Sequence, residues 1–286
     1  MQIIKHYYRD DTLRQSFNAL AEDTFGLNFE NWYRNGFWND CYDPYSVVED
    51  GRVVANVSVN RTDLMMDGQL RRVYQLGTVM TAPEYRNRGY IRAIMSEIEK
   101  DISDGEGVYL FANDAVLEFY PKFGFRRGKE TVFSRTVEQM APSTMEQIPM
   151  DGPAAWAKLD AAMKESVPFS ACEMVGNPGL IFFYAAQFLR EYVYYSCDLD
   201  AWAIAEREGE HLLLHSVFSR KLQHLTDVIG AFGPEVKQVT LGFTPLETEG
   251  FTARTLEEPD CTFFVKGPVF RTFGEKQLRI PTLSHA

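Results

Sequence analysis

The chain has 286 residues, of which 45% are hydrophobic and 14% aromatic, so it holds enough apolar material for two folded domains. Its 29 Lys and Arg residues face 40 Asp and Glu residues, and the net charge of −11 argues against nucleic acid as a general partner. There is neither a run of about 18 apolar residues, which a membrane span needs, nor a signal-peptide core. We therefore expect a cytoplasmic protein without a membrane partner.

The four cysteines lie far apart, at positions 41, 172, 197 and 261, and no C-x-x-C pair occurs. The five histidines form no ligand cluster near them. We expect free thiols and no metal, rather than a disulfide framework or a zinc site. An acidic surface would favour a cationic substrate such as an amine, although the same charge balance also serves solubility alone.

Residues 3–8 predict a short strand, and Asp10-Asp11 can cap a helix that runs to Phe25 and ends at Gly26. The aromatic-rich residues 28–38 predict a second helix. Asp-Gly pairs at 50–51 and 67–68 predict two tight hairpin turns. An antiparallel meander should therefore lead into the next strand.

That strand is predicted over residues 76–81, which are apolar and rich in β-branched side chains. From Gly89 onward the hydrophobic period changes to that of a helix. The apolar side chains then fall on one helical face: Ile91, Ile94, Met95, Ile98 and Ile102.

The loop between strand and helix reads Arg86-Asn87-Arg88-Gly89. The first turn of a helix presents free N–H groups and a partial positive charge, to which the arginines add full charges. Such a turn suits a phosphate or pyrophosphate. The alternative is a solvated basic loop on an ordinary strand–helix connection.

A short buried strand is predicted over 108–111, parallel to the strand before it through a right-handed crossover. Asn113 or Asp114 should cap a short helix that Pro121 and Gly124 end. We expect a final strand pair, 125–127 with 131–136, to close this sheet. The breakers in residues 138–153 predict a linker.

The second half repeats this order of elements faintly. Strands are predicted over 192–196, 201–206, 211–218 and 236–243, with a helix over 222–232 and a closing strand over 261–265. The Arg86-Asn87-Arg88-Gly89 loop of the first half has no counterpart after Phe218 in the second half. Tyr120 in the first half also has no matching tyrosine there. We expect this repeat not to bind a cofactor, but to wall a pocket or pair subunits, as in a possible homodimer.

Two motifs in the first 137 residues resemble the GNAT superfamily of N-acetyltransferases. The family's acetyl-CoA loop, Q/R-x-x-G-x-G/A, resembles Arg86 to Ile91 here, with Ile91 in place of the usual small residue. The family's later N…fY…GF pattern resembles Asn113, Phe119-Tyr120 and Gly124-Phe125. The variant loop is similar to the enhanced-intracellular-survival type, which carries a second degenerate GNAT-like unit and usually a sterol-carrier-like domain, for which this chain is too short.

The resemblance implies an α/β (α+β) GNAT fold with a mixed central sheet flanked by helices. The expected organisation is a catalytic domain over 1–137, a linker over 138–153 and a degenerate GNAT-like domain over 154–286. It also implies acetyl-CoA as co-substrate, no metal, and transfer of the acetyl group to a primary amine of a small molecule or peptide.

The resemblance also implies roles for individual residues. The cofactor-binding set would comprise the backbone of Val79, Met80 and Thr81 along the pantetheine arm, then Arg86, Asn87, Arg88, Gly89, Tyr90 and Ile91 around the pyrophosphate, and Asn113. Tyr120 would act as general acid on the departing thiolate, since a phenol pKa near 10 is close to that of a thiol. Candidate bases for the amine are Glu30, Asp40 and Asp43.

Two alternatives stay open. A non-catalytic acyl-CoA-binding or sensor protein would keep the loop and lack turnover, and Ile91 and the absence of an identifiable base favour it slightly. A different phosphate-ligand enzyme on an α/β sheet is disfavoured, because the sequence has neither a G-K-[ST] loop nor G-x-G-x-x-G.

Overall fold

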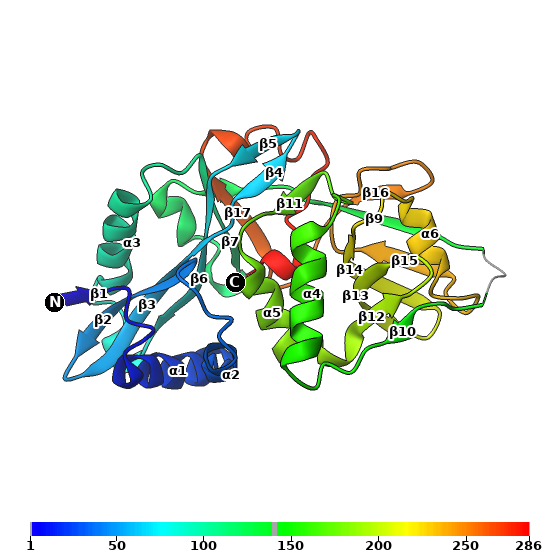
Figure 1. Ribbon diagram of the computed structural model, residues 1–286. Helices are drawn as coiled ribbons and strands as arrows, with labels where there is room; N and C mark the ends of the chain where they lie inside the picture. Colours follow the sequence, from blue (N-terminus) through cyan, green and yellow to red (C-terminus); the bar gives the residue numbers. More distant parts are fainter. Residues whose placement is uncertain (1, 139–141, 286) are drawn as a thin grey trace.

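The computed structural model describes residues 2–138 and 142–285 (Figure 1). Two seven-stranded mixed sheets stand side by side, with helices between them and on their outer faces. A third sheet of three strands lies at one end of the junction between them. The mixed α/β architecture expected from the sequence is confirmed.

The first sheet has the order β1-β2-β3-β6-β7-β17-β8. Its strands are β1 (Gln2–Ile4), β2 (Tyr42–Glu49), β3 (Arg52–Arg61), β6 (Val73–Thr81), β7 (Gly107–Ala112), β17 (Thr262–Lys266) and β8 (Arg126–Arg127). β6 and β7 are parallel, and the other neighbours are antiparallel.

The second sheet has the order β10-β12-β13-β14-β15-β9-β16. Its strands are β10 (Glu146–Gln147), β12 (Val193–Ser196), β13 (Ala201–Glu208), β14 (His211–Ser219), β15 (Gln238–Leu241), β9 (Thr131–Thr136) and β16 (Thr252–Thr255). The small sheet holds β11 (Cys172–Met174), β4 (Leu64–Met66) and β5 (Gln69–Arg71).

Six α-helices are found in the described part of the chain: α1 (Asp11–Phe25), α2 (Glu30–Arg34), α3 (Tyr90–Asp101), α4 (Pro153–Glu165), α5 (Pro178–Gln187) and α6 (Leu225–Gly230). Short 3-10 helices cover Pro83–Tyr85, Asp114–Val116, Tyr120–Phe123, Arg190–Tyr192, Pro268–Phe270 and Thr282–Ser284. Among residues 2–138 and 142–285, no helix combines the length and apolar character that crossing a bilayer requires.

Local signals in the first 100 residues produce the elements they predict. The Asp10 carboxylate accepts the Leu13 N–H at 3.0 Å as N-cap of α1, and Gly26 ends that helix in the left-handed conformation. Asp50 and Gly51 both have positive φ, as a type I′ hairpin turn requires. Residues 28–38 differ from the expectation, since α2 covers only Glu30–Arg34.

The prediction that residues 125–127 and 131–136 pair with each other and close the first sheet is wrong. β8 pairs with β17, whereas β9 crosses into the second sheet and pairs with β15 and β16. The closing strand expected for the second half, β17, instead inserts between β7 and β8 of the first sheet. The two halves thus exchange one strand each, and the domain bounds at residues 137 and 154 stay a prediction.

The exchange is symmetric in topology. In the first sheet the order β3-β6-β7-β17 runs antiparallel, parallel, antiparallel, and β13-β14-β15-β9 repeats this order in the second. A helix connects each parallel pair, α3 in the first half and α6 in the second. The faint repeat in the sequence therefore corresponds to a repeat in the fold.

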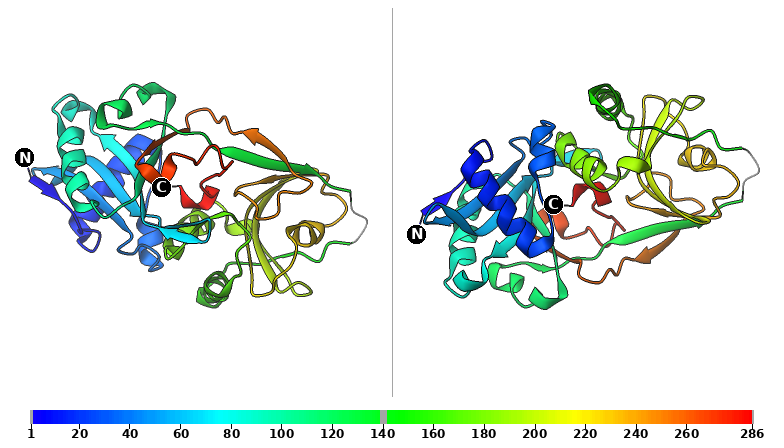
Figure 2. Two further views of the ribbon diagram at one scale, coloured as in Figure 1. Left: turned by 90° about the horizontal axis from the view of Figure 1, so that it is seen from above. Right: turned by 90° about the horizontal axis from the view of Figure 1, so that it is seen from below.

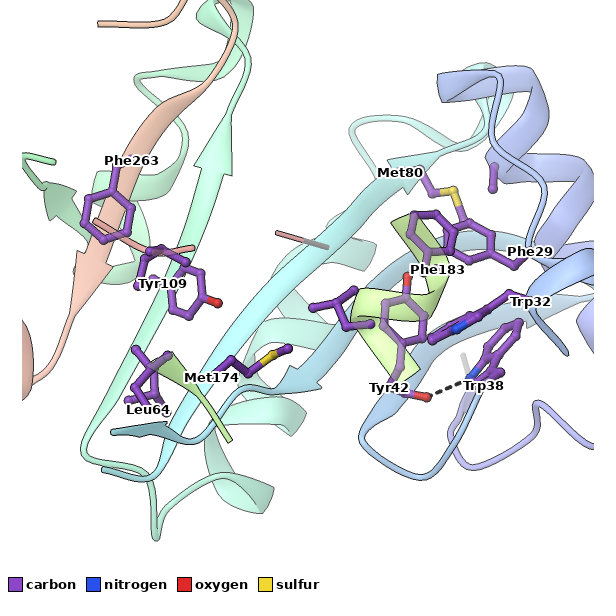
Figure 3. Packing of buried hydrophobic residues seen from close by; sticks show 14 of the residues in the cluster. Phe29, Trp32, Trp38, Tyr42, Leu64, Met80, Tyr109, Met174, Phe183 and Phe263 are labelled. Atoms are coloured by element: carbon purple, nitrogen blue, oxygen red, sulfur yellow. Dashed lines mark hydrogen bonds between the residues drawn. The ribbon is translucent and has the colours of Figure 1, made fainter. Parts of the chain in front are cut away.

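Helix α5 lies between the two sheets (Figure 2), and its side chains belong to the cores of both halves. Its Leu180 and Phe183 pack in the cluster on one face of the first sheet, where Figure 3 shows Phe183 among the rings of α2 and its neighbours. Phe182 and Ala185 pack against the second sheet. The indole N–H of Trp32 also donates to the carbonyl of Gly179 at 2.7 Å.

Glu130 fixes the crossing between the sheets. The buried side-chain carboxylate of Glu130 accepts the backbone N–H of Ile280 at 2.8 Å. The backbone carbonyl of Glu130 accepts the N–H of Leu256. Burial raises the pKa of Glu130 to about 7. The β8–β9 connection is therefore tied to two segments of the C-terminal part of the chain.

A fragment of residues 1–137 should fail to fold on its own. It would lack β17, which leaves one edge of β7 and all of β8 unpaired, and its β9 would have no sheet to join. Circular dichroism and size-exclusion chromatography should show an unfolded or aggregated fragment. Co-expression with residues 138–286 should restore a soluble, folded complex, whereas a monomeric fragment 1–137 with cooperative unfolding would contradict this prediction.

Candidate active site

Strands β6 and β7 part shortly after they meet. Their parallel pairing covers three residue pairs and ends at Gln75 and Tyr109. Beyond that point, within the described residues, β6 pairs only with β3, and β7 pairs only with β17. The facing backbone edges of 76–81 and 110–112 are thus free to pair with an extended ligand.

A β-bulge shapes the free edge of β6. Gly77 pairs with Ser58 and Met80 pairs with Asn56, so Thr78 and Val79 together lie opposite one residue of β3. Thr78 has φ of 42°, which is unusual for a β-branched residue. A bulge bends its strand and redirects the following amides, so Val79 and Met80 lie where the backbone changes direction.

Buried hydroxyl and amide groups hold the bulge. The Thr78 hydroxyl lies 2.6 Å from the Ser58 hydroxyl and 2.8 Å from that of Tyr42. The side-chain amide of Asn56 donates to the Thr78 carbonyl at 2.9 Å and to the Ser58 hydroxyl at 3.0 Å. Because a strained backbone costs roughly 1–3 kcal/mol, it persists only when neighbouring contacts fix it in this way.

The loop after β6 forms the turn that the sequence predicts. Asn87 and Gly89 have φ of 62° and 80°, and Gly89 is the N-cap of α3. A Cβ at Gly89 would meet no atom within 4 Å, so backbone conformation, not crowding, calls for glycine here. The first intrahelical bond runs from the Ala93 N–H to the Gly89 carbonyl at 3.1 Å, so the preceding amides face outward.

Three arginines surround this turn. Arg86 donates to the Thr81 carbonyl at 3.3 Å, and Arg88 donates to the Glu84 carbonyl at 2.9 Å while its guanidinium lies 4.7 Å from the Tyr85 ring centre. Both are exposed, as is Arg92. Their charges are therefore available to an anion at the start of α3.

Tyr90 and Ile91 begin α3 and are half-buried. The Tyr90 hydroxyl donates to the Glu49 carboxylate, and Ile91 packs against the core on the α3 face of the sheet. The larger side chain at position 91 is accommodated because it turns toward that core rather than toward the loop.

Tyr120 lies on the same face of the sheet as α3. Its ring centre is 5.4 Å from that of Phe119, 5.7 Å from Phe264 and 6.3 Å from Phe125, in the cluster that includes Ile94. No hydrogen-bond partner for its hydroxyl is found among the described residues. Burial raises the pKa of Tyr120 to about 12, so the hydroxyl keeps its proton at neutral pH.

Asn113 follows β7 directly and is exposed with an extended backbone. The short helix expected after it is two separate 3-10 turns, Asp114–Val116 and Tyr120–Phe123. Gly124 ends the second turn with φ of 81°. Asn113 and Tyr120 thus stand at opposite ends of this connection.

The three candidate bases are already engaged. Glu30 pairs with Arg14 and Arg34, each at 3.0 Å, and the Arg14 hydrogen bond lowers its pKa, which makes it a weak base. Asp40 accepts the Tyr8 hydroxyl at 2.7 Å, and Asp43 accepts the backbone N–H of His6 at 2.7 Å.

A segment from the end of the chain covers the other face of β7. The His285 ring stacks on Phe111 with centres 3.8 Å apart, and the Tyr109 hydroxyl donates to the Ser284 carbonyl at 3.0 Å. Burial lowers the pKa of His285 to about 3. Because these contacts span more than 170 residues of sequence, nothing local to either segment could predict them.

The comparisons with known proteins agree with this geometry. Residues 7–128 match the family model described as an acetyltransferase (GNAT) domain. No curated protein matches the chain significantly in sequence.

Solved structures share the fold over most of the chain. A conserved protein of unknown function from Enterococcus faecalis V583, described as a probable N-acyltransferase, is 15% identical with a TM-score of 0.60, over 95% of this chain and 74% of that one. Eis1 from Mycobacterium abscessus is 12% identical with a TM-score of 0.57, over 92% and 73%. A GCN5-related N-acetyltransferase from Kribbella flavida is 16% identical with a TM-score of 0.56, over 93% and 72%.

The splayed strands and the Gly89 turn lie within residues 7–128, the part of the chain that matches the acetyltransferase (GNAT) domain family. The chain as a whole, second half included, shares its fold with these three solved structures. At these identities the solved structures show the fold alone.

Thr78→Val should destabilise the protein by about 1–3 kcal/mol, because it leaves the buried hydroxyls of Ser58 and Tyr42 without their shared partner. Denaturant unfolding measures this loss. Thr136→Val, at an exposed strand position, is the matched control and should change stability by less than about 0.5 kcal/mol. Equal effects of the two substitutions would show that the bulge does not depend on the hydroxyl.

Proposed function

We propose that this chain is an acetyl-CoA-dependent N-acetyltransferase that acts on a primary amine of a small molecule or peptide. The observation that carries the proposal is the parting of β6 and β7, with the Gly89 turn following β6 at the start of α3. An extended thioester arm would fit between the strands, and a diphosphate would fit on the amides at the start of α3.

The residues fit acetyl-CoA in three places. The backbone of Val79, Met80 and Thr81 would pair with the pantetheine arm beyond the bulge. The amides from Asn87 to Ile91 would hold the pyrophosphate, helped by the charges of Arg86 and Arg88. Asn113, exposed at the end of β7, would donate a hydrogen bond to the arm or to the acceptor.

The chemistry proposed for the site is direct transfer. The amine nitrogen forms a bond to the acetyl carbon, the carbon–sulfur bond breaks, and its electron pair stays on sulfur. The Tyr120 hydroxyl gives its proton to that sulfur and later regains one from water, while a base takes the proton of the attacking amine. The buried hydroxyl keeps its proton at neutral pH, as a proton donor must, but its raised pKa makes it a weaker acid than a free phenol.

Tyr120→Phe should lower the turnover number by roughly 100-fold or more and leave CoA binding nearly unchanged, since only the proton donor is lost. A thiol-release assay against a panel of primary amines measures the rate. Tyr192→Phe is the matched control in the second half, where no hydrogen bond of that hydroxyl is found among the described residues. Similar rates for Tyr120→Phe and wild type would contradict the assigned role.

If the wild type binds CoA but acetylates no amine of the panel, the non-catalytic acyl-CoA-binding alternative is favoured instead. Protection from unfolding by ATP but not by CoA would favour a different phosphate-ligand enzyme.

Gly89→Ala should weaken CoA binding by about tenfold, because alanine disfavours the left-handed conformation that aims the loop amides at the diphosphate. Calorimetric titration with CoA measures the affinity. Gly209→Ala is the matched control. Gly209 also has a positive φ, 59°, and open space where a Cβ would lie, but it is in the β13–β14 hairpin. We expect it to leave CoA affinity unchanged; equal losses would place the diphosphate elsewhere.

A further inference from the structure

A cavity of about 510 Å³ lies between the two sheets, away from the Gly89 turn. It is bounded by α5, β11, β14 and the 3-10 helix Thr282–Ser284. Its wall is largely apolar and includes Phe169, Ile181, Val217, Phe218, Phe243 and Leu283. A volume of several hundred Å³ with apolar walls is typical of a small-molecule site.

Two charged side chains line this cavity. Lys164 is neutralised by Asp160 one helical turn away, at 2.5 Å. The Glu173 carboxylate has no hydrogen bond and no ion pair with any residue in the described part of the chain. The polar neighbours Ser170 and Asn177 already donate to protein carbonyl or amide oxygens.

Strand alternation explains why Glu173 reaches the cavity. Its neighbours on β11, Cys172 and Met174, pack in the core of the first half, and Figure 3 shows Met174 beside Leu64 and Tyr109. The side chain between them must therefore point away from that core, toward the second sheet.

A half-buried, unpaired carboxylate among apolar walls is costly, because it has lost part of its hydration without gaining a counter-charge. Burial raises the pKa of Glu173 to about 7, and no nearby cation opposes the shift. A ligand that supplied a positive charge would remove this cost, and an apolar body would fill the remaining space.

We propose that this cavity binds an organic cation, with its ammonium group on the Glu173 carboxylate and its apolar body against the aromatic and aliphatic wall. The net charge of −11 also favours a cation over an anion. The binding mode needs no acetyl transfer and would hold if the proposed enzymatic activity were absent.

The site is separate from the proposed acetyl-CoA slot but close to it in structure. Ser284 lines the cavity, and its carbonyl accepts the hydroxyl of Tyr109 on β7. The short helix Thr282–Ser284 therefore stands between the cavity and the strand that parts from β6.

Calorimetric or NMR titration of the full chain with 2-phenylethylammonium, and with the neutral 2-phenylethanol of similar shape, tests the site. We expect the ammonium compound to bind the wild type at least tenfold more tightly than the alcohol. Glu173→Gln should remove that difference. Glu146→Gln, at an exposed position of β10, changes the net charge equally and should preserve it.

Ser216→Phe provides a second variant that keeps Glu173. Ser216 lines the cavity on β14, so the larger side chain should fill it and abolish saturable binding of both probes. The proposal is overturned if the wild type does not bind the ammonium compound, if it binds the alcohol equally well, or if folded Glu173→Gln retains the preference.

Discussion

The short parallel contact between β6 and β7 is the constraint on which the structure depends. Three residue pairs join the strands, and then each strand turns to a different partner, β3 on one side and β17 on the other. Two free backbone edges therefore face each other inside a continuous sheet. The bulge at Thr78 lies in β6 beside this opening, and the Gly89 turn follows β6 at the start of α3.

The opening requires that β7 be held from the far side, and the chain achieves this with a strand from its own C-terminal part. β17 pairs with β7 along five residues, and His285 and Ser284 fix the same strand through stacking and a hydrogen bond. The first sheet therefore includes a strand that the second half of the chain contributes. Helix α5, which contributes to both cores, reinforces this connection.

The sequence predicts the elements whose signals are local. The Asp10 cap, the Asp-Gly turn at residues 50–51 and the loop at Gly89 all form as expected, because each depends on a few adjacent residues. The exchange of β9 and β17 could not be predicted, since both are short strands whose sequence patterns fit either sheet. The conformation of Thr78 was not predicted either, because its β-branched side chain indicates a regular strand. Its positive φ is held by hydroxyl and amide groups that are distant in the sequence.

The reciprocal exchange of strands bears on how the protein is made. During translation, β7 is synthesised about 150 residues before β17. One edge of β7 therefore has no partner strand through much of translation. Folding from the N-terminus cannot proceed to completion domain by domain. The first sheet can be completed only after β17 has been synthesised, and during that interval the unpaired edge of β7 is open to wrong pairing with other chains.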